Sequence, residues 1–138
     1  MMRKSLHCAA CGAQLTAPLQ ILSGKDPAVP EPSLEDGKPL TARGIGFKSY
    51  EPILWGTSGD RPPLDFTPQY WLNPEDLTAE VRLTRNRKRL SGCCGLAGTG
   101  GPNQLCQCGA EIGTLRTDCW TPCMFIPEPT NTTWIDES

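Results

Sequence analysis

The sequence lacks any long hydrophobic run. Its longest apolar stretches, such as residues 18–22, fall far short of the roughly 20 residues that a membrane-spanning helix needs. Arg3 and Lys4 open the chain, but no apolar run of signal-peptide length follows them before Cys8. The sequence therefore predicts a cytoplasmic protein with no membrane partner.

Histidine is almost absent, because His7 is the single one in 138 residues. A hydrolytic zinc site normally uses histidine ligands and a nearby general base, and no His-Glu-x-x-His motif is present. The nucleotide-deaminase signature and the phosphate-binding G-x-x-x-x-G-K-[ST] loop are missing too. The glycine-rich residues 98–102 follow no buried strand, so we interpret them as a turn. We expect no enzymatic activity.

An excess of positive charge is also lacking, since 13 Lys and Arg face 15 Asp and Glu and the net charge is −2. This composition excludes a global basic field that would draw the protein to nucleic acid. One local exception is a basic run, which could contact phosphates or an acidic protein surface, or could simply be the solvated end of a helix. It comprises Arg82, Arg85, Arg87, Lys88 and Arg89.

Apolar residues make up only 38% of the chain, whereas glycine and proline contribute 14 residues each. Long regular elements must therefore be few, and a small core needs cross-links. Asn73-Pro74 followed by two acids is typical of a helix start, and predicts one clear helix over 74–84. Strands are predicted over 15–22, 46–54 and 110–120. The expected class is α+β, as a small irregular single domain spanning 1–138.

The residues that the chain does have in quantity are its eight cysteines. In the reducing cytoplasm, clustered cysteines are more often metal ligands than disulfides. They fall into four close pairs, three of which are followed by glycine, and four pairs are what two tetrahedral zinc ions would require. We therefore predict Zn²⁺, one or two per chain, with these candidate ligands: Cys8 and Cys11, Cys93 and Cys94, Cys106 and Cys108, Cys119 and Cys123.

A single zinc site remains an alternative, with the other cysteines buried as small apolar residues. It would join Cys8 and Cys11 to either Cys106 and Cys108 or Cys119 and Cys123, which closes the longest loop. In either case the turn 8–12 is expected to pack against the segment 92–123. Iron–sulfur ligation is disfavoured because the usual cluster motifs are absent, and His7 is expected to be a surface residue.

The cysteine-bearing ends also resemble a group of small bacterial cysteine-rich proteins with no established activity. The similarity lies in an N-terminal Cys-x-x-Cys-Gly and in the motifs Gly92-Cys93-Cys94-Gly95-Leu96, Gly100-Gly101-Pro102-Asn103, Cys106-x-Cys108-Gly109-x-Glu111-x-Gly113-Thr114 and Asp118-Cys119-Trp120. In that group the position of Cys123 is often histidine, which implies that Cys123 is a zinc ligand. An acid commonly stands where this chain has Ala97.

Three functional hypotheses follow. The first is a non-catalytic zinc-binding protein that presents a rigid surface to another protein, as an immunity or antitoxin-like partner does. The second is a nucleic-acid-binding zinc module that uses the basic run 82–89. A third, weaker hypothesis is a metal or redox sensor, for which Cys93 and Cys94 would need a reactive thiolate.

Overall fold

The computed structural model describes residues 3–32, 35, 37–51, 66–90, 95–96, 102–117 and 122–137, and they form a mostly β structure. The strands within these ranges are β1 (Arg3–Cys8), β2 (Gln20–Ser23), β3 (Ile45–Ser49), β4 (Gln69–Leu72), β5 (Val81–Leu83), β6 (Gln104–Cys106), β7 (Glu111–Arg116), β8 (Met124–Pro127) and β9 (Thr132–Glu137).

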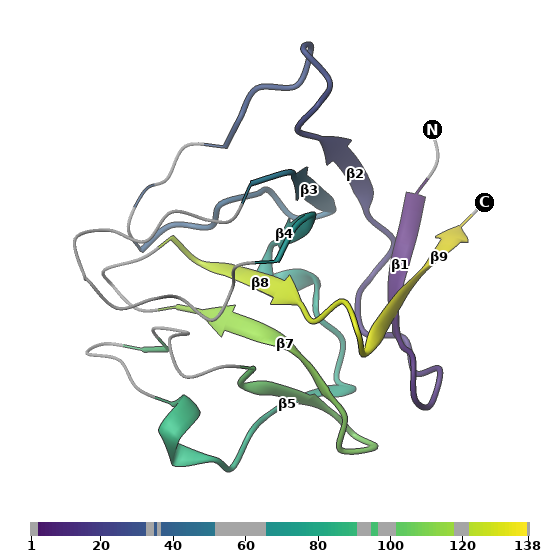
Figure 1. Cartoon of the computed structure of the whole chain (residues 1–138), viewed down its shortest axis with the longest axis vertical. Coiled ribbons are helices and arrows are strands. Elements are labelled where there is room, and N and C mark those ends of the chain that lie inside the picture. The colour runs from purple at the N-terminus through teal and green to yellow at the C-terminus, as the bar shows by residue number, and fades with distance from the viewer. Residues whose placement is uncertain are drawn as a thin grey trace.

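Seven of these strands form one sheet in the order β2-β3-β4-β8-β7-β6-β5, so that β2 and β5 are its two edges. Only β2 and β3 pair in parallel, and the other neighbours are antiparallel. β1 and β9 form a separate antiparallel ladder in which Arg3 is opposite Glu137, which brings the two ends of the described chain together (Figure 1).

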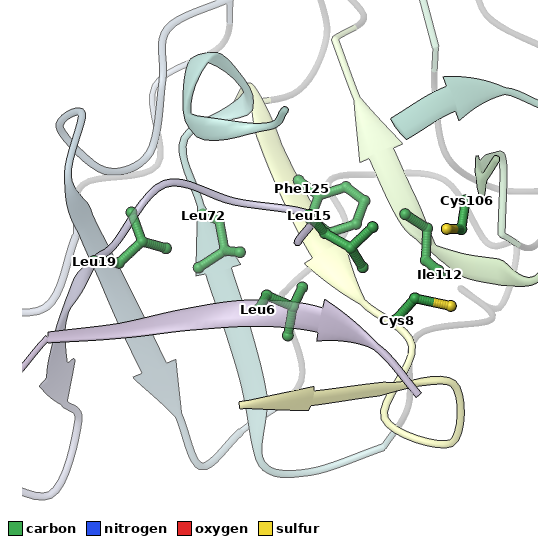
Figure 2. Close-up of a cluster of buried hydrophobic side chains, with 8 residues drawn as sticks. All are labelled: Leu6, Cys8, Leu15, Leu19, Leu72, Cys106, Ile112 and Phe125. Atoms are coloured by element: carbon green, nitrogen blue, oxygen red, sulfur yellow. The ribbon is translucent and has the colours of Figure 1, made fainter. Parts of the chain in front are cut away.

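The buried hydrophobic side chains form two clusters. One contains Leu6 of β1, Leu72 of β4 and Phe125 of β8, all without solvent exposure, and it also includes Cys8 and Cys106 (Figure 2). The adjacent residues of β4 and β8 belong to the other cluster, which includes Trp71, Met124 and Ile126. Side chains alternate between the two faces of a strand, so both faces of the central strands are buried.

The predicted α+β class is wrong, because the described residues contain no helix of seven or more residues. The two helical pieces are single 3-10 turns, η1 (Pro74–Asp76) and η2 (Arg87–Arg89). The described residues likewise contain no helix long and apolar enough to cross a membrane.

The helix predicted over 74–84 begins as expected and then stops. Asn73 accepts a hydrogen bond from the Glu75 N–H at 2.8 Å, as an N-cap does, but Leu77 is already extended, with φ −72° and ψ 141°. Tertiary contacts take over at this point: the buried Asp76 accepts a hydrogen bond from the Gly44 N–H at 2.8 Å, and Leu77 forms a β-bridge with Thr16. The remaining residues of the predicted helix include strand β5.

The strand predictions were more accurate than the helix prediction where the apolar pattern was clear. β7 lies within the predicted strand 110–120, and β3 begins one residue before the predicted strand 46–54. Residues 52–54 and 118–120 of these predictions lie outside the described ranges. In the predicted strand 15–22, only the end belongs to regular strand β2, while Thr16 and Leu19 form isolated bridges. Strand β9 was not among the predicted strands, and its partner β1 is more than a hundred residues away in sequence.

Candidate metal centre

Two short turns carry the candidate ligands, and they are built in the same way. In the first turn, residues 8–13 after β1, the Gly12 N–H donates to the Cys8 carbonyl at 2.8 Å and the Cys8 N–H to the Ala13 carbonyl at 2.9 Å. Gly12 has φ +80°, a conformation that glycine adopts without steric cost. The chain therefore reverses directly after Cys11.

The second turn, residues 106–110 between β6 and β7, repeats this pattern with one residue fewer. The Gly109 N–H donates to the Cys106 carbonyl at 2.8 Å, and the Cys106 N–H donates to the Ala110 carbonyl at 2.9 Å. Gly109 has φ +96°. Each turn thus presents two sulfur atoms on the same side of a tight loop, the arrangement called a zinc knuckle.

The fold brings the two knuckles face to face. The sulfur atoms of Cys8, Cys11, Cys106 and Cys108 all lie within 4.8 Å of one another. Cys8 Sγ is 3.6 Å from Cys108 Sγ, and Cys11 Sγ is 3.5 Å from Cys106 Sγ. Ligands about 2.3 Å from a tetrahedral zinc are about 3.8 Å apart, so these spacings are close to those of a four-sulfur metal site. These four cysteines lie close enough to hold a metal ion.

Burial divides the cluster into an inner and an outer half. Cys8 and Cys106 are buried at the end of the hydrophobic cluster next to Ile112, whereas Cys11 and Cys108 are exposed (Figure 2). A metal ion here would sit at the rim of the core, with one side toward solvent.

Hydrogen bonds outside the cluster fix one knuckle against the other. Asn131, in the turn before β9, accepts a hydrogen bond on its backbone carbonyl from the Ala9 N–H at 2.9 Å. Its side-chain amide donates to the Glu111 carbonyl at 2.7 Å, at the start of β7. Asn131 therefore links the Cys8 turn to the strand that follows the Cys108 turn, through contacts that require no metal.

The four thiols influence one another electrostatically. Burial raises the pKa of Cys8, but hydrogen bonds from the backbone at Cys11 and Ala10 and from the neighbouring thiols outweigh it and lower the pKa to about 7. The pKa of Cys106 is raised to about 12, mainly by burial. A hydrogen bond from the backbone at Cys108 lowers this pKa, but it does not offset burial, and hydrogen bonds with the other three thiols raise the pKa further. One thiolate is therefore easily formed, and further ionisation calls for a neutralising cation.

His7 lies beside the cluster without contributing to it. Its Nε2 is 2.8 Å from Ser5 Oγ and its Nδ1 is 3.2 Å from the Gly12 carbonyl, so both ring nitrogens already have partners. Ser5 in turn donates to Glu137 at 2.6 Å. The histidine thus connects the first knuckle to the β1–β9 ladder.

Cys123 lies elsewhere in the fold. It directly precedes β8, whose first residue Met124 pairs with Arg116, whereas the cysteine cluster adjoins the Glu111 end of β7. The two ends of this six-residue strand are about 17 Å apart. Burial raises the pKa of Cys123. The other predicted ligands, Cys93, Cys94 and Cys119, lie outside the described residues, and so do the residues 98–102 predicted as a turn.

The alternative left open by the sequence, namely which C-terminal pair faces Cys8 and Cys11, is decided by strand pairing. β5, β6 and β7 form a meander at one end of the sheet, and its β6–β7 turn meets the end of β1. Sequence spacing contains no information on this meeting. Asn131 was not recognised as a site residue, because a lone polar residue in a turn carries no signal of its long-range partners.

In comparisons with known proteins, no family model matches the chain, and neither a curated protein nor a solved structure matches it.

Proposed function

We propose that Cys8, Cys11, Cys106 and Cys108 bind one zinc ion whose role is structural. The observation that carries this proposal is the convergence of four sulfur atoms within 4.8 Å from two knuckles about a hundred residues apart. A tetrahedral set of four sulfurs is typical of zinc or of iron, and thiolates compensate the positive charge of either ion. Zinc is favoured because the cysteine spacings do not match iron–sulfur motifs.

A complete ligand set argues for structure and against catalysis. Catalytic zinc keeps one coordination position for water or substrate, whereas four cysteines would fill all positions of a tetrahedral ion. The ion would join the end of β1 to the β6–β7 turn and so close a loop of the chain between Cys8 and Cys108. Its binding free energy would then contribute directly to the stability of the fold.

The scaffold held in this way would act as a non-catalytic binding protein, with another macromolecule as its partner. An immunity or antitoxin-like role belongs to this class of small binding proteins. A cytoplasmic location suits the chemistry, since the five cysteines within the described residues are free thiols and the cytoplasm keeps thiols reduced.

The number of zinc ions is part of the same proposal. The four clustered cysteines would supply one site. A second site would need Cys123 together with Cys93, Cys94 and Cys119, the three cysteines outside the described residues. The metal content of the whole chain distinguishes one ion from two.

The test is elemental analysis of the purified protein, with Cys108→Ser and Cys123→Ser as a matched pair of variants. We expect Cys108→Ser to lose one equivalent of zinc and to unfold at a lower temperature, because a three-thiolate site binds zinc more weakly. If only one ion binds, Cys123→Ser keeps the wild-type zinc content. If two bind, each variant loses one equivalent.

Cobalt substitution adds a geometric check, because tetrahedral cobalt–thiolate centres absorb visible light. Wild-type protein and Cys123→Ser should both show the absorbance of the clustered site, and Cys108→Ser should lose that part of the absorbance. Wild-type protein without metal, or with iron in place of zinc, would contradict the proposal. Equal metal content in the wild type and in Cys108→Ser would do the same.

A further inference from the structure

A groove of about 600 Å³ lies on the outer face of the antiparallel pair β5–β6, beside the second knuckle. Arg82 is opposite Leu105 in the strand register, and Thr84 and Gln107 follow at alternate positions on the same face. The side chains of Val81 and Cys106 point the other way, toward the hydrophobic cluster. The full lining consists of Arg82, Thr84, Arg85, Asn86, Leu105 and Gln107.

Among the described residues, the polar lining of this groove is rich in hydrogen-bond donors and contains no carboxylate. Two guanidinium groups, from Arg82 and Arg85, provide the charge. The side-chain oxygen of Asn86 already accepts from the Lys88 N–H at 3.1 Å, which leaves its NH₂ group as the part free to bind a ligand. A site with two cations and amide donors selects an anion.

The residues of the basic run differ in whether they have partners within the fold. Arg89 pairs with Glu111 and donates to the Pro102 carbonyl at 3.0 Å, so it serves the fold. Within the part of the chain that the structure describes, Arg82, Arg85, Arg87 and Lys88 form no ion pair with an acidic side chain. Four positive charges therefore remain available along β5 and the following turn.

We propose that this groove binds the phosphate groups of a nucleic-acid backbone. Guanidinium groups match phosphate in shape and donate two parallel hydrogen bonds to it. The net charge of −2 does not oppose this binding, because charges farther than about 8 Å are largely screened at physiological salt. The groove would thus act through its local charge.

The lining also distinguishes between possible anionic partners. A protein partner would need a buried aromatic or aliphatic anchor, and the only apolar residue among the described lining residues is the half-buried Leu105. The described part of the lining includes no aromatic side chain, so it offers bases no surface on which to stack. Contacts to phosphates, without sequence readout, are what these side chains can provide.

The inference does not depend on zinc. Arg82 and Arg85 are positioned by β5 and the bend after it, whereas only Gln107 belongs to the metal knuckle. A failure to bind nucleic acid would leave the metal content unchanged, and a missing metal would leave both arginines in place. The two proposals can therefore fail separately.

The test is fluorescence anisotropy with a labelled single-stranded oligodeoxythymidine over a range of salt concentrations. We expect binding at low salt and about a tenfold or greater loss of affinity in the double variant Arg82→Gln/Arg85→Gln. The slope of log affinity against log salt should fall by about 0.7 for each arginine removed, since each phosphate contact releases counterions. The conservative variant Arg82→Lys/Arg85→Lys keeps both charges and should retain most of the slope.

The matched control is Arg3→Gln/Lys25→Gln, which removes the same charge at exposed positions of β1 and beyond the opposite sheet edge, β2. It should bind like the wild type. Thermal unfolding confirms that every variant is folded. Equal losses in the control and in the groove variant would overturn the proposal, as would the absence of binding by the wild type. Binding of a polyglutamate peptide in preference to the oligonucleotide would also overturn it and indicate an acidic protein partner.

Discussion

Asn131 shows how one side chain can prepare a metal site that it does not touch. It bonds the first knuckle through its backbone carbonyl and the start of β7 through its side chain. These two contacts help to hold the two pairs of sulfur atoms at nearly the spacing that a tetrahedral metal needs. Such partners of ligand-bearing segments tune metal affinity, because less order must be created on binding.

We therefore predict that Asn131→Ala weakens metal binding by about tenfold, within the range known for partners of metal ligands. The measurement is a competition titration of the protein against a chromogenic chelator. Thr130→Ala is the control, because Thr130 is exposed and, within the described residues, its hydroxyl bonds only to Glu128, two residues away. Unchanged affinity in Asn131→Ala would show that the metal alone sets the spacing.

At the level of elements, the two knuckles lie on strands that differ in their position relative to the seven-stranded sheet. β7 and β8 lie in the middle of the seven-stranded sheet, whereas β5 is an edge and β1 pairs with β9 outside that sheet. The proposed metal joins the end of β1 to the turn of the β6–β7 hairpin. β1 and the β6–β7 turn, which carry the ligands, should depend on the ion more than the centre of the sheet does.

Removal of the metal should therefore loosen the structure locally. We predict faster amide hydrogen exchange in residues 8–13 and 106–110 after chelation, because their turns lose their common anchor. Strands β3 and β4, held by the second hydrophobic cluster, should change little. Hydrogen exchange measured by mass spectrometry, with and without chelator, separates these regions. A uniform increase over the whole chain would instead indicate global unfolding.

For the whole molecule, the proposed metal would couple stability to pH. A bound metal holds its thiolates ionised well below the pKa that each thiol has when free, which is about 7 for Cys8 and about 12 for Cys106. Groups whose pKa is lowered in the folded, metal-bound state stabilise it at neutral pH and lose that contribution as the pH falls.

We accordingly predict that zinc is retained at neutral and mildly alkaline pH and is released progressively on acidification, together with a fall in Tm. Zinc release is followed with a chromogenic chelator, and Tm by thermal unfolding at each pH. The Cys108→Ser variant should show a smaller pH dependence, because it has less bound metal to lose. Release on raising the pH from neutrality would contradict this sign.

Local chemistry could be predicted from the sequence because it depends on neighbouring residues. Glycine after a close cysteine pair predicts a knuckle, and Gly12 and Gly109 adopt the required positive φ. Asn73 caps a turn because its side chain reaches a backbone N–H two residues away. The sequence also predicted that cysteines cluster as candidate metal ligands, and four of them do lie close enough to hold a metal ion.

Long-range geometry was decided only by the tertiary structure. Whether the turn after Asn73 continues as a helix depended on Asp76 and Leu77, whose partners Gly44 and Thr16 are distant in sequence. The choice of Cys106 and Cys108 to face Cys8 and Cys11 likewise followed from strand order, which no cysteine spacing encodes. Local hydrogen bonds fix turns within a few residues, whereas burial and strand pairing determine which turns meet.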